Sequence, residues 1–515
     1  MAENTGTTTT GARGINPYVA GGAIAAVVLS FAIGLLITTN PVYGAALAFA
    51  VAFPVVYKFR KAFIMGYAAY LPFEELFLKF APDQLYPLFR YGAEGTIFLL
   101  FVVVVGENLL RGRGWRRTQL DLPIFMLAGA VLASTVVNSV PPTVAALGVK
   151  SVFRYIFLFF IITQSDYTRK DLKVFLSIFI ASGVLQIFAG LVQMVGGEYV
   201  YDFFRPRDVV VGDKILKSQD ITLSSEGLRV CGTLLRYGVY GNYIALLLCL
   251  PLARRYVGKD KGLATTAIIL LGAIVLVASF SRKGWIAMYI AFIYMNWLSG
   301  KKVKTAALLG LPILGVPFLL IYYGFAQSLT QETTANPIMR LVEMFSPDYL
   351  SHTLERTRLY ILTYVTYRIA RDFFWFGVGP GLIGSDVTGT AGGTTALVEV
   401  DRISGLDFAD ERLALLTDVG FVNIFAQIGF FGILAVVILL ARFIKQSKRL
   451  FITRADSETR TVALMFLGFT VIMIVESFFG SPLTYRAVSF YFWLFAGLLF
   501  SKGMAEDPAP GKAST

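Results

Sequence analysis

The sequence predicts an all-α, polytopic membrane protein with about fourteen transmembrane helices, within a range of about 12–14. Hydrophobic residues make up 56% of the 515 residues, and only 15% are charged. Soluble domains carry about 25% charged residues, so this chain lacks the polar surface that a soluble enzyme needs. Its hydrophobicity also excludes an intrinsically disordered protein. In addition, apolar stretches of about 20 residues, the length that crosses a bilayer, recur along most of the chain.

Each of these stretches is expected to form one helix. The third is the least apolar, because Glu74, Glu75 and Lys79 interrupt it. The first lacks a basic leading stretch and is too long for the hydrophobic region of a cleaved signal peptide, so we expect it to be a span. The expected spans are 17–39, 42–58, 62–81, 93–110, 121–140, 144–164, 173–196, 234–253, 262–280, 284–299, 304–325, 417–441, 461–480 and 484–502.

Basic residues follow every second span, from the second to the twelfth. This distribution predicts that the tails 1–16 and 503–515 are both cytoplasmic, and we expect the second tail to be disordered. It also accounts for the net charge of +13 as a topology signal, so nucleic acid is not an expected partner. The residues are Lys58, Arg60, Lys61, Arg111, Arg113, Arg116, Arg117, Arg169, Lys170, Lys173, Arg254, Arg255, Lys259, Lys261, Lys301, Lys302, Lys304, Arg442, Lys445, Lys448, Arg449 and Arg454.

Two long loops are predicted on the outer side of the membrane. One lies near 197–233, within the block of eleven helices at 17–325, and the other covers 326–416, before the last three helices at 417–502. Loops as long as the second are usually functional, and we expect it to be a catalytic extracytoplasmic region. Its basic residues are all arginines, whose planar, permanent charge suits phosphate and carboxylate. Salt bridges within the loop would also account for most of its charges.

One short turn breaks the charge rule. Ser281-Arg282-Lys283-Gly284 is basic, yet it falls on the predicted outer side. Ionisable residues at the membrane are rare and usually functional, and we favour a binding role for Arg282 and Lys283. The alternative is a pair of side chains that snorkel to the interface.

An amphipathic helix is expected over 354–376, because Leu354, Arg358, Ile361, Val365 and Arg368 recur at spacings of three and four. Its two arginines would lie beside an apolar stripe, where they could hold a lipid-linked phosphate or pair with neighbouring carboxylates.

A glycine-rich segment ends this helix. Gly379, Gly381 and Gly384 satisfy the G-x-G-x-x-G pattern of dinucleotide sites, but no strand precedes them as that site requires. We therefore predict a close-approach turn against the membrane.

Two further residues are candidates for proton transfer. His352 precedes the amphipathic helix and has a suitable side chain for a general base, or it simply starts the helix. Asp418 opens the twelfth span, either as an N-cap or as a carboxylate that faces the arginines. With one histidine and two cysteines in the chain, we expect no metal site and no cofactor.

These motifs together resemble the O-antigen ligase and Wzy-type polysaccharide polymerase superfamily. The usual pattern is R-x-x-G-T, then S-R-G, then R-x-x-x-W leading to G-V-G-P-G, then H-N with a downstream G-x-x-G. The resemblance covers about residues 225–435, where the chain has Arg229-Val-Cys-Gly-Thr, Ser281-Arg282-Lys-Gly-Trp285, Arg358, Gly377-Val-Gly-Pro-Gly381 and Gln427-Ile-Gly-Phe-Phe-Gly432.

The resemblance implies a GT-C-like membrane glycosyltransferase. It would catalyse metal-independent, inverting transfer from undecaprenyl-diphosphate-linked glycan at the outer face of the bacterial cytoplasmic membrane. By position, Arg282 and Arg358 would grip the diphosphate, and Arg229 would line the same entrance. Lys283, Gly379 and Gly381 fall within the matching motifs.

The chain departs from the family pattern in three places. Lys283 stands between Arg282 and the glycine of the S-R-G motif. Tyr360 and Ile361 stand where tryptophan is preferred, and Asp418 stands where the ligases carry histidine, with His352 too far upstream to replace it. The aspartate resembles the polymerase branch, which implies lipid-linked oligosaccharide as donor and acceptor, with flippase and chain-length regulator proteins as expected partners. A ligase that transfers glycan to lipid or protein remains the first alternative, and a flippase or transporter the second.

Overall fold

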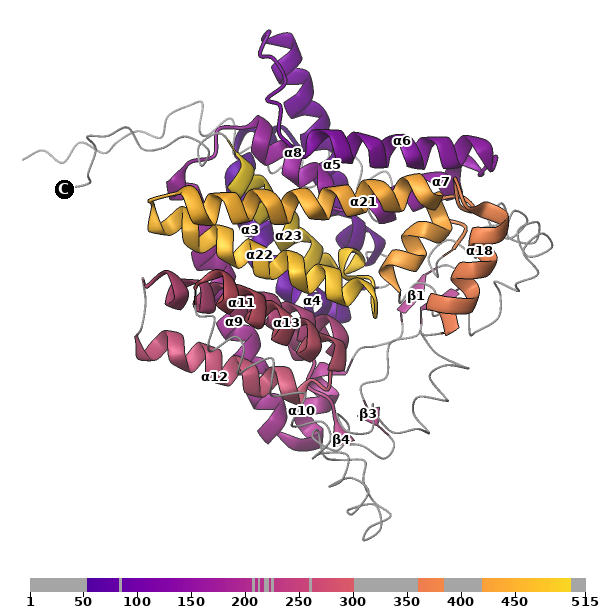
Figure 1. Cartoon of the computed structure of the whole chain (residues 1–515). Coiled ribbons are helices and arrows are strands. Elements are labelled where there is room, and N and C mark those ends of the chain that lie inside the picture. Colours follow the sequence, from indigo (N-terminus) through magenta and orange to yellow (C-terminus); the bar gives the residue numbers. More distant parts are fainter. Residues whose placement is uncertain are drawn as a thin grey trace, which may run out of the picture.

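The computed structural model describes residues 53–82, 86–205, 209–211, 214–216, 222–223, 227–258, 262–300, 360–383 and 419–501. Within these ranges the chain is mainly helical, as predicted (Figure 1). The helices are α3 (Arg60–Tyr70), η1 (Leu71–Phe73), α4 (Glu74–Phe80), α5 (Tyr86–Leu110), α6 (Asp121–Val137), α7 (Pro142–Phe153), α8 (Ile156–Gln164), α9 (Arg169–Val195), α10 (Gly197–Phe204), η2 (Gly232–Leu234), α11 (Tyr237–Val257), α12 (Leu263–Ala278), α13 (Arg282–Leu298), η3 (Ile361–Val365), α18 (Thr366–Phe373), α21 (Gly420–Thr453), α22 (Ser457–Ser477), η5 (Pro482–Thr484) and α23 (Arg486–Phe500).

Three of the described helices are both long and apolar enough to cross a membrane: α9, α21 and α22. The helices α6, α12 and α23 are apolar but shorter. The expected spans 17–39 and 304–325, most of 42–58, and the tails 1–16 and 503–515 lie outside the described residues. The predicted number of about fourteen spans therefore stays a prediction.

Two of the expected spans are interrupted. The span predicted at 62–81 is divided into α3, η1 and α4, and Pro72 stands in the interruption. The span predicted at 144–164 is divided into α7 and α8, and Tyr155 between them has a φ of 60°. Counting apolar residues predicted one continuous helix in each case. At these breaks the charged side chains of Glu74 and Arg154 pair with residues of other helices, as described below.

The predicted outer loop near 197–233 contains short strands that the sequence did not predict. β1 (Val209–Val211) pairs antiparallel with β2 (Lys214–Leu216), and β3 (Thr222–Leu223) pairs with β4 (Gly227–Leu228). The β-branched run 209–211 favours a strand over a helix. The fold is thus all-α within the expected spans, with two small hairpins added between α10 and α11.

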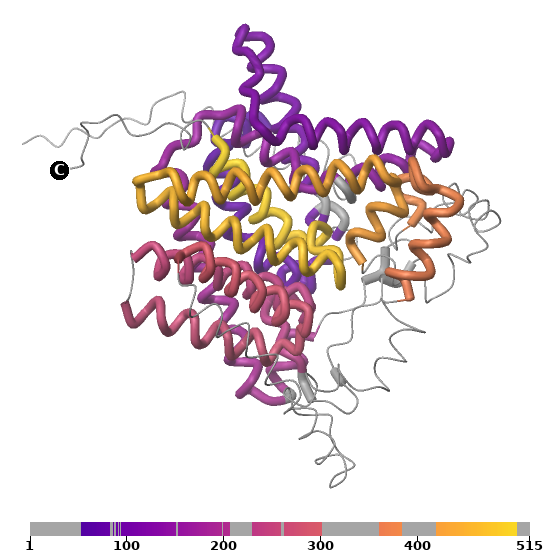
Figure 2. Tube along the Cα trace, viewed as in Figure 1, coloured from indigo at the N-terminus to yellow at the C-terminus, as the bar shows by residue number. Residues whose placement is uncertain are grey.

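The core forms around α22. Figures 1 and 2 show α22 lying along α21, with α11 and α13 on its other side, and the contacts between these helices agree. Aromatic rings fill the contact between α21, α22 and α23: the ring of Phe443 lies 5.3 Å from those of both Phe466 and Phe492. This packing joins α21, α22 and α23 in one core.

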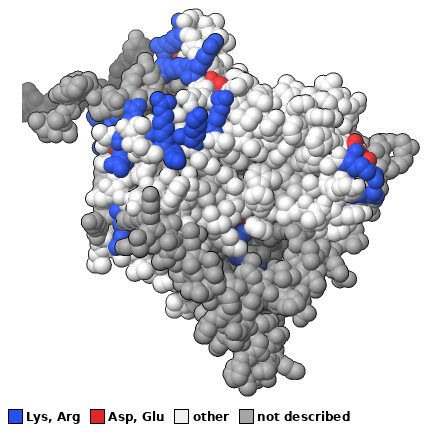
Figure 3. Space-filling model, in the orientation of Figure 1, with Lys and Arg blue, Asp and Glu red and all other residues white. Residues whose placement is uncertain are grey.

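The loops predicted to be cytoplasmic meet at one end of the bundle. Four ion pairs connect the segments that follow spans two, four, six and twelve, and Figure 3 shows lysine and arginine gathered at the upper left of the visible face. This common position is what the charge pattern predicted. The pairs are Lys61–Asp171 (2.8 Å), Arg116–Asp166 (2.7 Å), Arg169–Asp456 (3.0 Å) and Lys173–Glu458 (3.7 Å).

At this end, Asp456 caps α22 and gives a pH-dependent contribution to stability. Burial opposes its ionisation, but hydrogen bonds from Thr459 and Glu458 and the charge of Arg169 hold the pKa of Asp456 below its ordinary 3.8. A lowered pKa in the folded state means that the stabilisation is complete above pH 3.8 and is lost as the pH falls below it. We expect Asp456→Ala to cost about 1 kcal/mol at neutral pH, with the difference from the unchanged protein shrinking in thermal unfolding at acid pH. An equal difference at both pH values would contradict this assignment.

Candidate functional site

The predicted outer turn places Lys283 in a buried polar cluster. Lys283 lies in the first turn of α13, and its ammonium donates a hydrogen bond to the hydroxyl of Tyr485 at 2.8 Å. The same nitrogen lies 3.5 Å from Oε2 of Glu476, whose side chain is fully buried in α22. A buried carboxylate beside a lysine favours the charged ammonium. The Lys283 cluster, defined as Lys283, Glu476 and Tyr485, therefore fixes a positive charge at the start of α13.

The start of α21 packs against this cluster. The N–H of Gly420 donates to the carbonyl of Gly480 at 2.8 Å. A Cβ added to Gly480 would lie 2.5 Å from the Lys283 nitrogen, so a larger residue there would displace the ammonium. Asp418 lies outside the described residues, two positions before Gly420. The structure thus brings the chain immediately after Asp418 beside the Lys283 cluster.

Two arginines adjoin this region. The guanidinium of Arg229 lies over the ring of Tyr237, 4.4 Å from its centre. Burial lowers the pKa of Arg229; Tyr237 opposes this effect, and the positive charge of Arg282 adds to it. Arg282 therefore lies close enough to Arg229 for its charge to act on it. An anion between such charges would relieve the repulsion.

The glycine segment 377–381 makes a close backbone approach to α21, whereas the sequence predicted an approach to the membrane. The N–H of Val378 donates to the carbonyl of Ala426 at 2.7 Å, and that of Gly379 donates to the carbonyl of Gln427 at 3.1 Å. The N–H of Gly381 donates to the side-chain oxygen of Gln427 at 3.0 Å. These amides are occupied within the protein, so the structure gives Gly379 and Gly381 a role in joining two motifs of the chain.

Helix α6 also donates hydrogen bonds to the junction between the glycine segment and α21. The hydroxyl of Ser134 donates to the carbonyl of Gln427 at 2.9 Å, and the amide of Asn138 donates to the carbonyl of Gly377 at 3.0 Å. α21 is itself broken at Gly429, which has φ 68° and ψ −162°. The break frees the backbone of Gln427 to pair with the glycine segment.

A largely apolar cavity extends from this region between α6, α8, α21, α22 and α23. Along α21 its lining runs from Gly420 and Asn423 to Phe443, and along α23 it includes Phe492 and Trp493. Its polar lining is therefore concentrated near Gly420, and its opposite end is aromatic and aliphatic. The complete lining is Leu127, Ile156, Gly420, Phe421, Asn423, Ile424, Gln427, Val436, Leu439, Leu440, Phe443, Met473, Ser477, Ser481, Pro482, Leu483, Thr484, Phe492 and Trp493.

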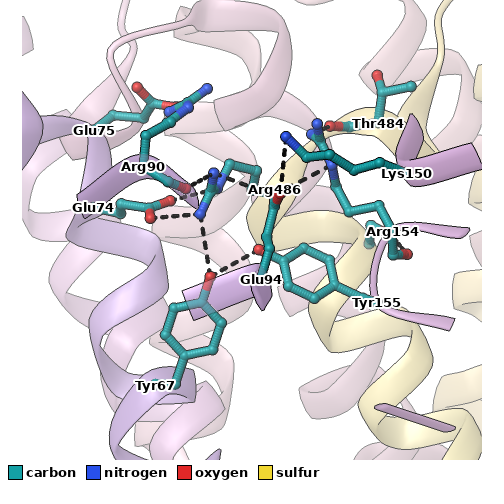
Figure 4. A network of polar contacts seen from close by, with 11 residues as sticks. Tyr67, Glu74, Glu75, Arg90, Glu94, Lys150, Arg154, Tyr155, Thr484 and Arg486 are labelled. Atoms are coloured by element: carbon teal, nitrogen blue, oxygen red, sulfur yellow. Dashed lines mark hydrogen bonds and ion pairs between the residues drawn. The ribbon is translucent and has the colours of Figure 1, made fainter. Parts of the chain in front are cut away.

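A second group of buried charges lies next to the Lys283 cluster in the chain. Figure 4 shows Arg486, the residue after Tyr485, between carboxylates from two other elements. Its guanidinium lies 2.7 Å from Glu74 and 3.2 Å from Glu94. We call Glu74, Glu94, Arg154 and Arg486 the buried ion network.

Several predicted site residues lie outside the described part of the chain. These are His352, Arg358 and Asp418, together with most of the outer loop 326–416. The predicted helix 354–376 is described from Tyr360 onward, where η3 and α18 form it. Its second arginine, Arg368, lies over the ring of Tyr364 at 5.9 Å.

Sequence reasoning missed Glu476, Tyr485 and the buried ion network. A signal was present: Glu476 is a carboxylate inside the expected span 461–480, and Glu94 lies at the start of the span 93–110. An ionisable residue in a span is by itself a candidate for function. The contact of Glu476 with Lys283, however, could be found only in the fold.

Comparison with known proteins bears on the same region. Residues 267–437 match the Wzy_C family model, which is described as O-antigen ligase. This region is therefore similar to O-antigen ligases. No curated protein matches the chain. The match runs from α12 through the break in α21, so this O-antigen ligase region contains Arg282, Lys283 and the glycine segment, whereas Glu476, Tyr485 and Arg486 follow it. The match supports, in general terms, a membrane enzyme of the O-antigen ligase or polymerase type.

Proposed function

We propose that the protein is a polysaccharide polymerase. It joins undecaprenyl-diphosphate-linked oligosaccharide units into surface or exopolysaccharide at the outer face of the cytoplasmic membrane. The carrying observation is the convergence of Arg229, Arg282 and Lys283 with the start of α21, inside or beside the matched O-antigen ligase region. These cations lie where α12 ends and α13 begins, away from the basic end of the bundle. Fixed positive charges in such a place suit a membrane-bound anion.

The proposed reaction needs three kinds of group. A hydroxyl of the acceptor sugar attacks the anomeric carbon of the donor, inverts it, and displaces the undecaprenyl diphosphate. Arg282, Lys283 and Arg358 stabilise the negative charge that develops on the leaving diphosphate, so the step needs no metal. Asp418 accepts the proton of the attacking hydroxyl, a role typically worth about 10²–10⁴-fold in rate.

The cavity supports a lipid-linked substrate. Its polar residues lie near Gly420, and its aromatic and aliphatic residues continue between the helices. A diphosphate at the Lys283 cluster would therefore have an apolar surface within reach for the polyprenyl chain. In this arrangement both termini are cytoplasmic and the site is extracytoplasmic, where flippase and chain-length regulator proteins are the expected partners.

The description of the matched family keeps a ligase as the second candidate. A ligase would move finished glycan to lipid or protein, and it would use the same cations on the same leaving group. The aspartate at position 418, where ligases carry histidine, is the feature that favours a polymerase. The acceptor therefore distinguishes the two candidates.

The test uses a deletion strain that expresses the unchanged protein, Arg282→Ala or Asp418→Asn. We expect both variants to reach the membrane and to abolish polymer, with single repeat units accumulating on the lipid carrier or on the final acceptor. Arg371→Ala is the matched control, because Arg371 is half-exposed and pairs with its neighbour Asp372. Full-length polymer stranded on the carrier would identify a ligase instead. Normal chain length in Asp418→Asn would refute the base assignment.

A further inference from the structure

The buried ion network surrounds Arg486 almost completely. The guanidinium grips Glu74 with two contacts of 2.7 Å, one from Nε and one from Nη2. Nη1 lies 3.2 Å from Glu94 and also donates to the carbonyl of Arg90, while Nη2 donates to the hydroxyl of Tyr67 at 3.3 Å. Only 6% of the Arg486 side chain and 1% of the Glu74 side chain are exposed. The first residue of α23 is thus held by α3, α4 and α5 together.

Arg154 holds the same segment from a different side. It lies in the break between α7 and α8, where Nη1 donates to the carbonyl of Thr484 and Nε lies 3.4 Å from Glu94. Lys150 adds a contact of 3.3 Å to the other oxygen of Glu94. Figure 4 shows these side chains converging on Glu94 and on the start of α23. The network therefore fixes the backbone on both sides of Tyr485.

Tyr485 connects this network to the proposed diphosphate site. It stands between Thr484, which Arg154 holds, and Arg486, which the two carboxylates hold. Its hydroxyl accepts the hydrogen bond from Lys283 at 2.8 Å. A shift of residues 484–486 would therefore move the partner of the Lys283 ammonium.

We propose that Arg486 is a positioning residue, which fixes Lys283 for the diphosphate through Tyr485. This inference rests on the proposed function. Its physical basis is that buried ion pairs contribute little net stability, since desolvation offsets their attraction, whereas a bidentate arginine defines geometry closely. A binding site needs its groups held to within about 0.5 Å. The network supplies that constraint from α3, α4, α5 and α7.

The experiment is a double-mutant cycle on the rate of transfer from lipid-linked donor. Arg486→Lys keeps the charge and loses the two-pronged contact, and we expect it to raise KM for the donor about tenfold while kcat changes less. In a Lys283→Met background the same change should have no further effect, because coupled residues are non-additive. Arg442→Lys is the matched control: Arg442 donates to the carbonyl of Gln119 at the opposite end of the bundle. Equal, additive effects of Arg486→Lys in both backgrounds would overturn the proposal.

Two further variants keep the test decisive. Tyr485→Phe removes only the hydroxyl and should reproduce the KM effect with an unchanged melting temperature. If Arg486→Lys does not fold, Arg154→Lys replaces it in the cycle, since Arg154 holds the other side of Tyr485. Normal donor KM in Tyr485→Phe would also overturn the proposal. The assay counts transfer to any acceptor, so it tests the role of Arg486 even if the protein is a ligase. Absence of transfer by the unchanged protein would instead refute the proposed function.

Discussion

Glu476→Leu is expected to destabilise the protein by about 3–5 kcal/mol, because it removes a buried carboxylate that faces a buried ammonium. Glu476 is fully buried and Lys283 is 12% exposed, so water cannot replace the lost charge. We expect a large fall in melting temperature in detergent and little folded protein in the membrane. Thermal unfolding monitored by size-exclusion chromatography measures the effect.

The same helix offers a matched control. Glu458 lies at the opposite end of α22 and pairs with Lys173, which is 64% exposed, at 3.7 Å. Glu458→Leu should cost no more than about 1 kcal/mol, as surface pairs do. The double change Glu476→Leu with Lys283→Leu should recover folding, because it removes both charges, but it should not recover glycan transfer. Equal melting temperatures for Glu476→Leu and Glu458→Leu would contradict the importance of the buried pair.

Helix positions were largely predictable where the sequence is uniformly apolar. The expected span 173–196 corresponds to α9, and 284–299 corresponds to α13. In such segments hydrophobicity alone specifies the helix, since a polar backbone must satisfy its hydrogen bonds internally in lipid. The charged ends were predictable too, and they meet in pairs such as Arg169–Asp456.

The breaks within spans could not be predicted in this way. α7 and α8 separate where Arg154 turns toward Glu94, and α3 and α4 separate where Glu74 turns toward Arg486. Arg486 and Glu74 are 412 positions apart in the chain. A local count of apolar residues contains no information about a partner so far along the chain. It therefore identified Glu74 only as a charge that interrupts the third apolar stretch.

The candidate site was predictable to the extent that short motifs carry it. Arg229 and Arg282 were expected to line one entrance. The charge of Arg282 acts on Arg229, and their shared role at the substrate stays a prediction. The glycine segment was expected as a close-approach turn against the membrane, and the structure shows its close approach to Gln427 of α21. Glu476 and Tyr485 were missed because they belong to no motif, and only the packing of α22 and α23 on α13 brings them to Lys283.

The junction of the two glycine motifs depends on a backbone conformation that only glycine adopts readily. At Gly429, φ 68° and ψ −162° lie in a region closed to other residues. A Cβ there would lie 2.3 Å from the carbonyl oxygen of Trp375 and 2.5 Å from the nitrogen of Phe376. Both obstacles are backbone atoms, so no side-chain rotation can make room. The break in α21 and the course of the glycine segment therefore require each other.

Gly429→Ala should destabilise the protein by about 3–5 kcal/mol, from backbone strain and steric overlap together. The matched control is Gly106→Ala in α5, where an added Cβ meets nothing within 4 Å and helix propensity favours alanine by about 1 kcal/mol. We expect thermal unfolding to show a large loss for the first variant and none for the second. Because Gln427 can reach the glycine segment only at this break, any folded Gly429→Ala protein should also lose glycan transfer. A stable, fully active variant would mean that α21 can run straight, and that the junction does not position the site.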